Sequence, residues 1–257
     1  MRYLASLRAH LPLLGKLLLV LLICAAAMPA LAQTLSLDMG DGQGGSSTGR
    51  IVQLVALLTV LSLAPGILVM VTSFTRIIVV LSFLRSALGV QQTPPNQVMI
   101  SLALFLTFFI MAPTFEKAWE NGIQPLMEDS IDEKAAFEAT TQPFHDFMML
   151  HVRDKDLLLF LDMGKIETKD LKPEDTPLQA LVPAFMISEL KRAFEIGFLL
   201  FLPFLVIDMV IASILMAMGM MMLPPVVISL PFKIIFFVLI DGWYMLAGSL
   251  VRSYGGG

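Results

Sequence analysis

Ionisable side chains inside apolar stretches are the residues of this chain whose types could do chemistry. Asp208 lies in the apolar run Pro203–Pro231, and Asp241 lies in the apolar run that follows. A charge near the centre of a bilayer costs about 2.5–3.5 kcal/mol on insertion scales, so it is tolerated when it is paired or faces protein. Two interpretations follow: the aspartates form a proton or ion relay, or they pair with charges on neighbouring helices or subunits.

The positions of these charges favour pairing over a relay. A relay needs several groups along one wet path, and the two aspartates lie on opposite arms of the expected hairpin. We therefore expect buried, paired charges at four positions in apolar context, namely Arg76, Arg85, Asp208 and Asp241. Glu189 stands at the entry to the last hairpin, and Lys233 lies about a third of the way along its return arm. A pair between them within one straight hairpin is possible, but the spacing does not require it.

The apolar run Pro203–Pro231 also contains a dense group of methionines. Five of the seven residues from 216 to 222 are methionines, with Gly219 among them and two prolines soon after. Two apolar arms around such a break predict a helical hairpin with the methionines at its tip. Three consecutive methionines, Met220, Met221 and Met222, cover most of a helix's circumference and cannot all face one core. Their flexible, polarizable thioethers favour a soft surface that adapts to a variable partner.

Signals for catalysis or metal binding are weak. His145 and His151 are six residues apart, which is not the i, i+4 spacing of a helical pair of ligands. The glycine-rich segment at 41–45 is not followed by the Lys-Ser/Thr of a phosphate-binding loop, and no Gly-x-Ser-x-Gly motif occurs. We predict no catalytic, cofactor-binding or metal site. Two alternatives stay open: a small ion or proton channel or transporter subunit that uses the two aspartates, and a membrane enzyme that uses residues 113–182.

The elements that position these residues belong to a helical membrane protein. Of the 257 residues, 57% are hydrophobic and 15% are charged, whereas soluble domains have about one-quarter charged residues. The N-terminus predicts a cleaved signal peptide over residues 1–32, because basic residues precede a short apolar stretch and the Ala30-Leu31-Ala32 site. That stretch, Leu17–Ala27, is too short to span a bilayer, which needs about twenty residues. An uncleaved anchor helix is the alternative.

Cleavage after Ala32 would change the mature chain. The only cysteine, Cys24, would be lost, so the mature protein would have no disulfide and no cysteine ligand. The signal takes away three of the 17 basic residues and none of the 21 acidic ones, which leaves a net charge of −7. This charge excludes the usual electrostatic footprint of nucleic-acid binding. The new N-terminus would lie outside the cytoplasm.

The expected fold class is all-α, with two kinked hydrophobic helical hairpins separated by an acidic helical domain. The segments in order are a flexible linker at 33–50, a first hydrophobic hairpin at 51–112, the acidic domain at 113–182, a second hydrophobic hairpin with the methionine tip at 183–252, and a disordered tail at 253–257. Pro65-Gly66 is expected to kink or interrupt the first apolar helix, and Pro113 to end the last helix of the first hairpin.

Orientation follows from the signal and from four expected crossings. The acidic domain, with 15 acidic and 7 basic residues, would be periplasmic, and the methionine tip would lie on the cytoplasmic side. The loop at 72–98 has two arginines and no acidic residue, which gives weak support from the positive-inside rule.

Four sequence blocks resemble one known family. They are VMVTSFTRIIVVLSFLRSALG at 69–89, TPPNQV at 93–98, PAFMISELKRAFEIGFLLFLPFLVIDM at 183–209 and PFKIIFFVLIDGW at 231–243. In this order and at this length they resemble the FliP/SctR family of type III secretion export-gate proteins, and the resemblance covers residues 51–254. Virulence members of the family usually lack a cleavable signal, so the expected signal peptide favours the flagellar branch.

The resemblance implies a function and partners. A family member would be a core subunit of the flagellar export gate, in which five copies form a helical ring with FliQ and FliR, near FlhB and FlhA. The ring would belong to the flagellar basal body in the bacterial inner membrane, and unfolded export substrates would pass through it. Met220, Met221 and Met222 match the family's loop that forms a gasket across the channel. Glu189 and Lys233 match positions, in the SEL and PFK motifs, that are associated with contact between adjacent protomers.

Overall fold

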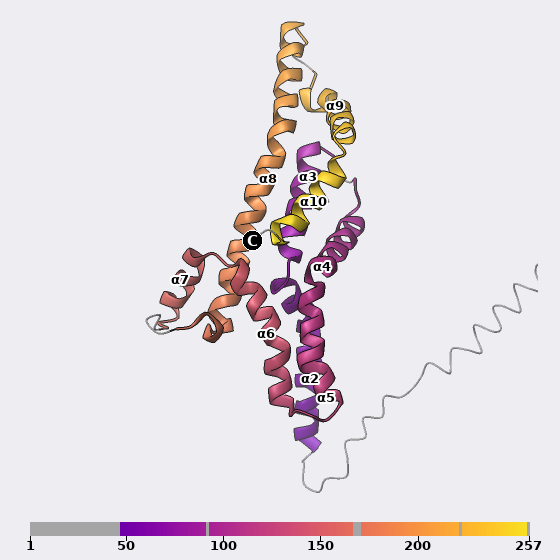
Figure 1. Cartoon of the computed structure of the whole chain (residues 1–257). Coiled ribbons are helices and arrows are strands. Elements are labelled where there is room, and N and C mark those ends of the chain that lie inside the picture. The colour runs from indigo at the N-terminus through magenta and orange to yellow at the C-terminus, as the bar shows by residue number, and fades with distance from the viewer. Residues whose placement is uncertain (1–46, 91–92, 167–170, 221–222, 256–257) are drawn as a thin grey trace, which may run out of the picture. The chain divides into compact units, whose positions relative to one another are not determined.

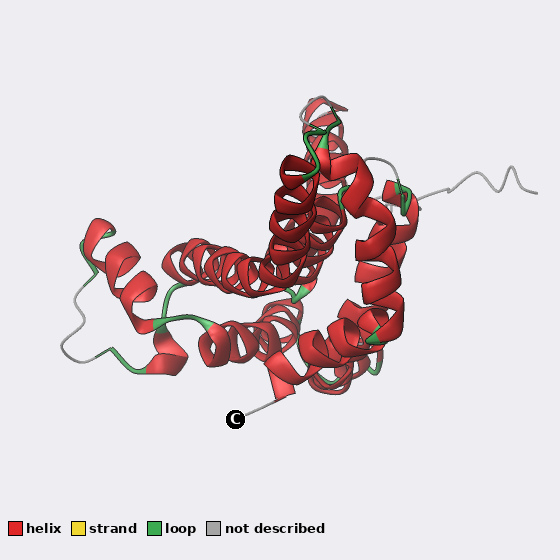
Figure 2. Ribbon diagram, turned by 90° about the horizontal axis from the view of Figure 1, so that it is seen from above, coloured by secondary structure: helices red, strands yellow, loops and turns green. Residues whose placement is uncertain are grey.

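The computed structural model describes residues 47–90, 93–166, 171–220 and 223–255 (Figure 1). All regular elements in these ranges are helices, which confirms the predicted all-α class (Figure 2). The chain divides into two compact units, Met1–Leu57 and Leu58–Gly257. The described part of the first unit is the beginning of one helix, and the second unit contains the candidate site. The predicted signal peptide and most of the predicted linker lie outside the described residues.

The first apolar segment forms two helices, α2 (Ser47–Met70) and α3 (Phe74–Leu88). Helix α2 begins inside the predicted linker and is not interrupted at Pro65-Gly66, because a proline removes only one N–H donor from a long helix. Helix α3 ends at Gly89, whose φ is 76° and whose N–H donates to the Ser86 carbonyl at 3.1 Å. Glycine adopts this left-handed conformation without strain, so it ends the helix and turns the chain.

The next helix passes through the position where it was expected to end. Helix α4 (Asn96–Ala118) includes Pro113 and continues into a π-helical turn, η2 (Trp119–Ile123), and a short helix, α5 (Gln124–Met127). Thr114 and Ala118, beyond the proline, are buried, and α6 packs against this part of the chain. Tertiary packing therefore extends the helix, and the predicted end at Pro113 is wrong.

The acidic segment is helical, as predicted. It forms α6 (Glu133–His151), α7 (Asp154–Met163) and the 3-10 turn η3 (Pro173–Asp175). The Asp132 carboxylate caps α6 by accepting a hydrogen bond from the Ala135 N–H at 3.0 Å. The segment's expected end at residue 182 falls inside α8 (Leu178–Ala217), just as its expected start falls inside α4. The composition changes at both positions, but the secondary structure does not.

The return arm of the second hairpin is two helices instead of one. Helices α9 (Pro225–Leu239) and α10 (Gly242–Gly255) are bent by 63° relative to each other. The bend contains Asp241, whose φ of 51° is a left-handed conformation that aspartate tolerates better than most residues. Helix α10 includes Ser253–Gly255, so the predicted disordered tail is wrong for these residues, and 256–257 lie outside the described ranges.

Two helical stretches within the described ranges are long and apolar enough to cross a membrane, Asn96–Met127 and Leu178–Ala217. The bent pair α9 and α10 would add a third if it counts as one span. The expected crossing at 51–71 falls on α2, whose side chains are described only in part. Many apolar side chains of these helices are exposed in the single chain, so lipid or other subunits must cover them.

Helix α3 is the centre of the second unit, because it packs against α4, α8 and α9. The main core joins α3 to all of these helices and to α10; its members include Ile77, Leu81, Leu84, Ala103, Ala193, Phe204, Phe237 and Leu250. A smaller cluster, with Met148, Leu181 and Phe185, fills the contact between α6 and α8. These two cores position the charged side chains of the candidate site.

Candidate functional site

The centre of the site is a buried ion pair between α3 and α8. Arg76 is 1% exposed and Glu189 is 0% exposed. The guanidinium Nε donates to Glu189 Oε2 at 2.9 Å, and Nη2 donates to Oε1, so the two side chains meet in a bidentate fork. This geometry adds specificity to the Coulombic attraction. A charge that lost its partner here would be strongly destabilising.

A close approach of the two helices makes this contact possible. Gly197 lies on α8 eight residues beyond Glu189, where a Cβ atom would stand 2.5 Å from the Phe83 ring of α3. Only glycine fits at that distance, so the backbone of α8 lies directly on the α3 side chain. This close packing of α3 and α8 brings the side chains of Arg76 and Glu189 within hydrogen-bonding distance.

The C-terminal turn of α10 completes this cluster. The Tyr254 hydroxyl donates to Glu189 Oε2, and its ring lies under the Arg76 guanidinium, with 3.8 Å between Cζ and the ring centroid. Arg76 Nη1 also donates to Ser253, at 3.0 Å to Oγ and 3.3 Å to the carbonyl. Tyr254 therefore satisfies the carboxylate and stacks on the cation, a favourable arrangement for a desolvated arginine.

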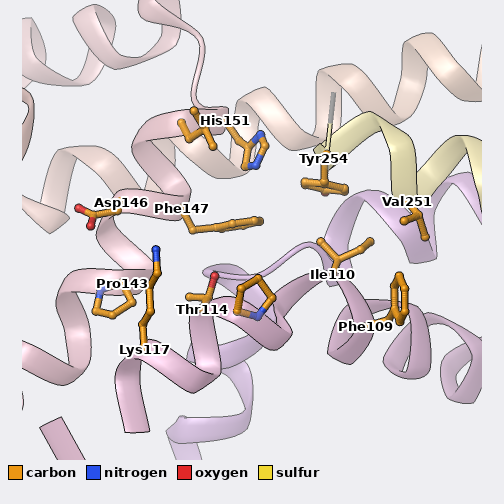
Figure 3. Close-up of a pocket in the computed structure, with 13 residues that line it drawn as sticks. Phe109, Ile110, Thr114, Lys117, Pro143, Asp146, Phe147, His151, Val251 and Tyr254 are labelled. Atoms are coloured by element: carbon orange, nitrogen blue, oxygen red, sulfur yellow. The ribbon is translucent and has the colours of Figure 1, made fainter. Parts of the chain in front are cut away.

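Two side chains of α6 close the other side of Tyr254. Phe147 stacks on its ring at 5.9 Å between centroids, and His151 meets it edge-on at 5.0 Å (Figure 3). Burial, and then the positive charges of Arg76 and Arg192, lower the pKa of His151 from 6.5 to about 4. His151 is therefore neutral at neutral pH and adds no second cation beside Arg76.

A neighbouring polar cluster attaches α7 to Ser188 of α8, the residue before Glu189. Arg153 Nε donates to Asp156 Oδ2 at 2.7 Å, and the Ser188 hydroxyl donates to the same oxygen at 2.7 Å. Burial raises the pKa of Asp156, but the hydrogen bonds from Ser188 and Arg153 and the charge of Arg153 outweigh it, so the pKa lies below its ordinary value of 3.8. The sequence reasoning did not identify these residues.

A second ion pair, with a buried lysine and a partly buried aspartate, lies farther along α8. Lys233 Nζ of α9 lies 2.6 Å from Asp208 Oδ2, with Lys233 3% exposed and Asp208 29% exposed. The same ammonium donates to the Ala87 carbonyl at 3.1 Å, and the Ser229 hydroxyl donates to Asp208 Oδ1. The Ala87 carbonyl belongs to the last turn of α3, where a positive charge also interacts favourably with the helix dipole. Lys233 therefore joins three helices at one point.

The methionine tip is exposed where the structure describes it. Met220 is 46% exposed, and Met216 and Met218, before it on the chain, are also exposed. Met221 and Met222 lie outside the described residues. Among the described residues, no group of three or more histidine, cysteine, aspartate or glutamate side chains could hold a metal ion.

Comparison with known proteins places the chain in a family. A sequence model of the FliP family matches residues 57–250. This chain belongs to the FliP family. It is 59% identical to the flagellar biosynthetic protein FliP of Caulobacter vibrioides over 90% of this chain and 87% of the relative. It is 56% identical to the protein of the same name from Bacillus subtilis, over 83% and 95% of the two chains, and 48% identical to that of Aquifex aeolicus, over 93% and 99%.

The two residues that the FliP resemblance singled out each have a partner in one copy of the chain. Glu189 binds Arg76 and Tyr254, and Lys233 binds Asp208. The predicted contact between Glu189 and Lys233 of adjacent copies stays a prediction. For that contact to form, Glu189 or Lys233 would have to share its partner within the same copy or give that partner up.

The four expected buried charges of this FliP-family chain differ in their surroundings. Arg76 is fully buried, and Asp208 is partly buried and paired. Arg85 is partly buried and donates to the Asn96 side chain. Asp241 is exposed in the single chain at the bend between α9 and α10, and its expected burial against a neighbouring subunit stays a prediction.

Tyr254 is another residue of the site that the sequence reasoning missed. Its signal was present in the spacing, because Gly242, Leu246, Leu250 and Tyr254 recur every fourth residue and are all buried on one face of α10. The three glycines that follow suggested disorder and obscured this period.

Proposed function

We propose that this chain is a core subunit of the flagellar type III secretion export gate, through which unfolded flagellar proteins leave the cytoplasm. The observation that supports the proposal is the match of the FliP family to residues 57–250. The relatives described above are named flagellar biosynthetic proteins. The role is structural, as a wall of the channel, and the proposal includes no catalytic step.

The exposed surfaces support an assembly. Helices α4, α8 and α9 expose large apolar side chains such as Phe105, Phe198 and Leu239. Four of the charges that lie within the apolar helices, in contrast, form the two ion pairs described above inside one copy of the chain. In the proposed gate, five copies form a ring with FliQ and FliR, close to FlhB and FlhA. The ring belongs to the basal body in the inner membrane, and the mature N-terminus and residues 113–182 face the periplasm.

The two ion pairs would fix α8 to its neighbouring helices in such a ring. Glu189 and Asp208 are 19 residues apart on one helix, which corresponds to about 28 Å. Arg76 and Tyr254 brace α8 at the first level, and Lys233 braces it at the second. Met220, the first residue of the proposed gasket, lies twelve residues beyond Asp208. A rigid stem would present a soft tip, which is the arrangement a deformable gasket of Met220, Met221 and Met222 needs.

Export of flagellar proteins tests the proposal directly. Deletion of the gene in its host should remove flagellar proteins from the culture medium, and the intact gene supplied in trans should restore them. Unchanged export and motility in the deletion strain would refute the proposal. N-terminal sequencing of the membrane-extracted protein should begin at Gln33, and a chain that keeps residues 1–32 would overturn the proposed topology.

The proposed contact between copies has its own test. Glu189→Lys and Lys233→Glu should each weaken the ring, and the double exchange should recover part of it. Asp208→Lys combined with Lys233→Glu is the matched control, because it restores the pair within one copy. If the Glu189/Lys233 exchange is no better than the worse single variant, the contact between copies does not form.

The ion-channel alternative makes a different prediction. Asp208 is held by Lys233 and Ser229, and Asp241 lies eight residues beyond Lys233 at an exposed bend. If the two aspartates conducted ions, Asp208→Asn with Asp241→Asn would abolish conductance across vesicles. For an export-gate subunit, conductance should not depend on Asp241.

A further inference from the structure

A pocket of about 490 Å³ lies between α6 and the 3-10 turn η3. Its apolar wall consists of Met149 and Leu150 of α6 and Pro173 of the turn. The volume is within the range of pockets that hold small molecules, about 300–1,000 Å³. None of the residues that line the pocket belongs to the two ion pairs of α8, so it is a separate site.

His145 brings a buried nitrogen without a hydrogen-bond partner to this pocket. Its side chain is 7% exposed, and Nε2 lies 2.9 Å from the Thr176 carbonyl oxygen. A carbonyl oxygen can only accept, so Nε2 carries the proton and Nδ1 of the neutral ring is an acceptor. Nδ1 is buried and makes no hydrogen bond within the described part of the chain. A buried acceptor without a donor is costly, so a ligand that donates to Nδ1 would gain affinity.

Asp146 places a carboxylate beside that nitrogen. Its Oδ1 lies 3.8 Å from His145 Nδ1, which is too long for a hydrogen bond, and both atoms are acceptors. Oδ1 also accepts a hydrogen bond from Gln142 at 2.9 Å, but a carboxylate oxygen can accept more than one. Asp146 is 67% exposed, so its side chain can shift to admit a donor between the two atoms. A primary ammonium, with three N–H donors, can bind both atoms at once.

Glu174 is a second carboxylate of the same pocket, on the side of η3. Its Oε1 lies 3.7 Å from Lys172 Nζ, and the two side chains are 68% and 70% exposed. An exposed pair of this kind contributes little stability, so the ammonium of a ligand can displace Lys172. The surrounding acidic segment, with 15 acidic and 7 basic residues, also attracts cations.

We propose that this pocket binds an aliphatic diamine. One ammonium would donate to His145 Nδ1 and to Asp146, the other would pair with Glu174, and the methylene chain would pack on the apolar wall. A metal ion fits less well, because within the described ranges no group of three or more potential ligands could hold one. The proposal does not depend on the export function.

Isothermal titration calorimetry of the full-length chain in a nonionic detergent at pH 7 tests the proposal. The probes are 1,5-diaminopentane, its bis(trimethylammonium) analogue and 1,5-pentanediol. The analogue keeps both charges but has no N–H donor, and the diol keeps hydrogen-bond donors but has no charge. We expect one diaminopentane per chain and about tenfold weaker binding of the other two probes, which corresponds to the loss of a charged hydrogen bond. Equal binding of the diamine and its methylated analogue, or no binding of the diamine, would overturn the proposal.

Two substitutions remove the acceptors. Asp146→Asn should weaken binding of diaminopentane about tenfold, because it removes the charge beside Nδ1. His145→Gln keeps an N–H donor for the Thr176 carbonyl but has no acceptor at the position of Nδ1, so it should weaken binding by a similar factor. Thermal unfolding checks that each variant is folded. Glu138→Gln, at an exposed position of α6 outside the pocket, is the control and should change nothing.

A third substitution should strengthen binding. Lys172 competes with the ligand for Glu174, so Lys172→Ala should tighten binding of diaminopentane about threefold. Lys134→Ala is the matched control, because it removes an exposed lysine that pairs with Glu138 outside the pocket and changes the net charge equally. If the two lysine variants bind diaminopentane alike, or if Lys172→Ala binds it more weakly than the intact chain, the pocket is not a diamine site.

Discussion

At the scale of residues, Glu189 depends on two partners from opposite ends of the chain. Arg76 is 113 residues away in sequence and Tyr254 is 65 residues away, and both hydrogen-bond its carboxylate. A buried ion pair is weak evidence for extra stability, but removal of one partner leaves an uncompensated buried charge. We therefore expect conservative substitutions in this cluster to lower the free energy of unfolding strongly.

The substitution Glu189→Gln removes the negative charge and keeps the shape. Arg76 would then be a buried cation without a counter-ion, so the free energy of unfolding should fall by about 3–5 kcal/mol. Thermal unfolding of the detergent-extracted chain, followed by tryptophan fluorescence, measures this loss. Glu195→Gln on the same helix is the control, because its pair with Lys191 at 3.6 Å is exposed and contributes about 0–1 kcal/mol. Equal shifts for the two variants would contradict the prediction.

The substitution Tyr254→Phe tests the C-terminal turn. It removes the hydroxyl that donates to Glu189 but keeps the ring on Arg76, so the loss should be that of one charge-assisted hydrogen bond, about 1.5–3 kcal/mol. Tyr244→Phe removes a hydroxyl from an exposed side chain of the same helix, and it should be nearly neutral. The comparison uses the same unfolding assay. A neutral Tyr254→Phe would mean that the turn is not part of the buried cluster.

His151 should make stability depend on pH in the acidic range. Its pKa is about 4 in the folded chain and 6.5 ordinarily, so below pH 6.5 the unfolded chain binds a proton that the folded chain does not. The stability is present above pH 6.5 and is lost as the pH falls toward 4, by about 1 kcal/mol for each pH unit. His151→Gln should flatten this slope in urea titrations at pH 7, 6 and 5. An identical slope in both proteins would show that His151 does not cause it.

At the scale of elements, the contact of α3 with α8 depends on Gly197. A Cβ atom there would stand 2.5 Å from the Phe83 ring, so Gly197→Ala must separate the helices or displace the ring. Overpacking of this kind costs about 1–3 kcal/mol, and it should also weaken the Arg76–Glu189 fork. Gly66→Ala in α2 is the control, since nothing lies within 4 Å of the added carbon. If both variants have the same unfolding temperature, the close approach is not a constraint.

At the scale of the whole molecule, the methionine tip should act only in the assembled ring. In the proposed gate, five copies of Met220–Met222 would close the channel with side chains that have three rotatable bonds and no branching. Changing all three to alanine should leave assembly intact and make the inner membrane leak small ions during export. Single changes should do much less, because neighbouring side chains fill the gap.

The measurement for the tip is membrane permeability to a small dye or potassium in exporting cells. Met216→Ala, on the last turns of α8, is the control because it lies on the regular helix before the tip. If the triple variant assembles and permeability stays unchanged, the methionines are ordinary packing residues.

The sequence by itself determined the properties that depend on local chemistry. Apolar runs of helical length predicted the all-α class and the long apolar helices, because backbone hydrogen bonding in a helix is satisfied within the segment. The four long motif blocks predicted membership of the FliP family. The exposed methionines before the tip also agree with a hairpin end that faces no core of its own chain.

Only the tertiary structure decided which charges meet and where the helices end. Arg76, Glu189 and Tyr254 lie far apart in sequence, and no spacing rule connects them, so their contact depends on the packing of α3, α8 and α10. Pro113 did not end α4 because burial against α6 outweighs the single hydrogen bond that the proline removes. The C-terminal turn is helical because Tyr254 has a buried carboxylate to bind, and that carboxylate is brought to it by another helix.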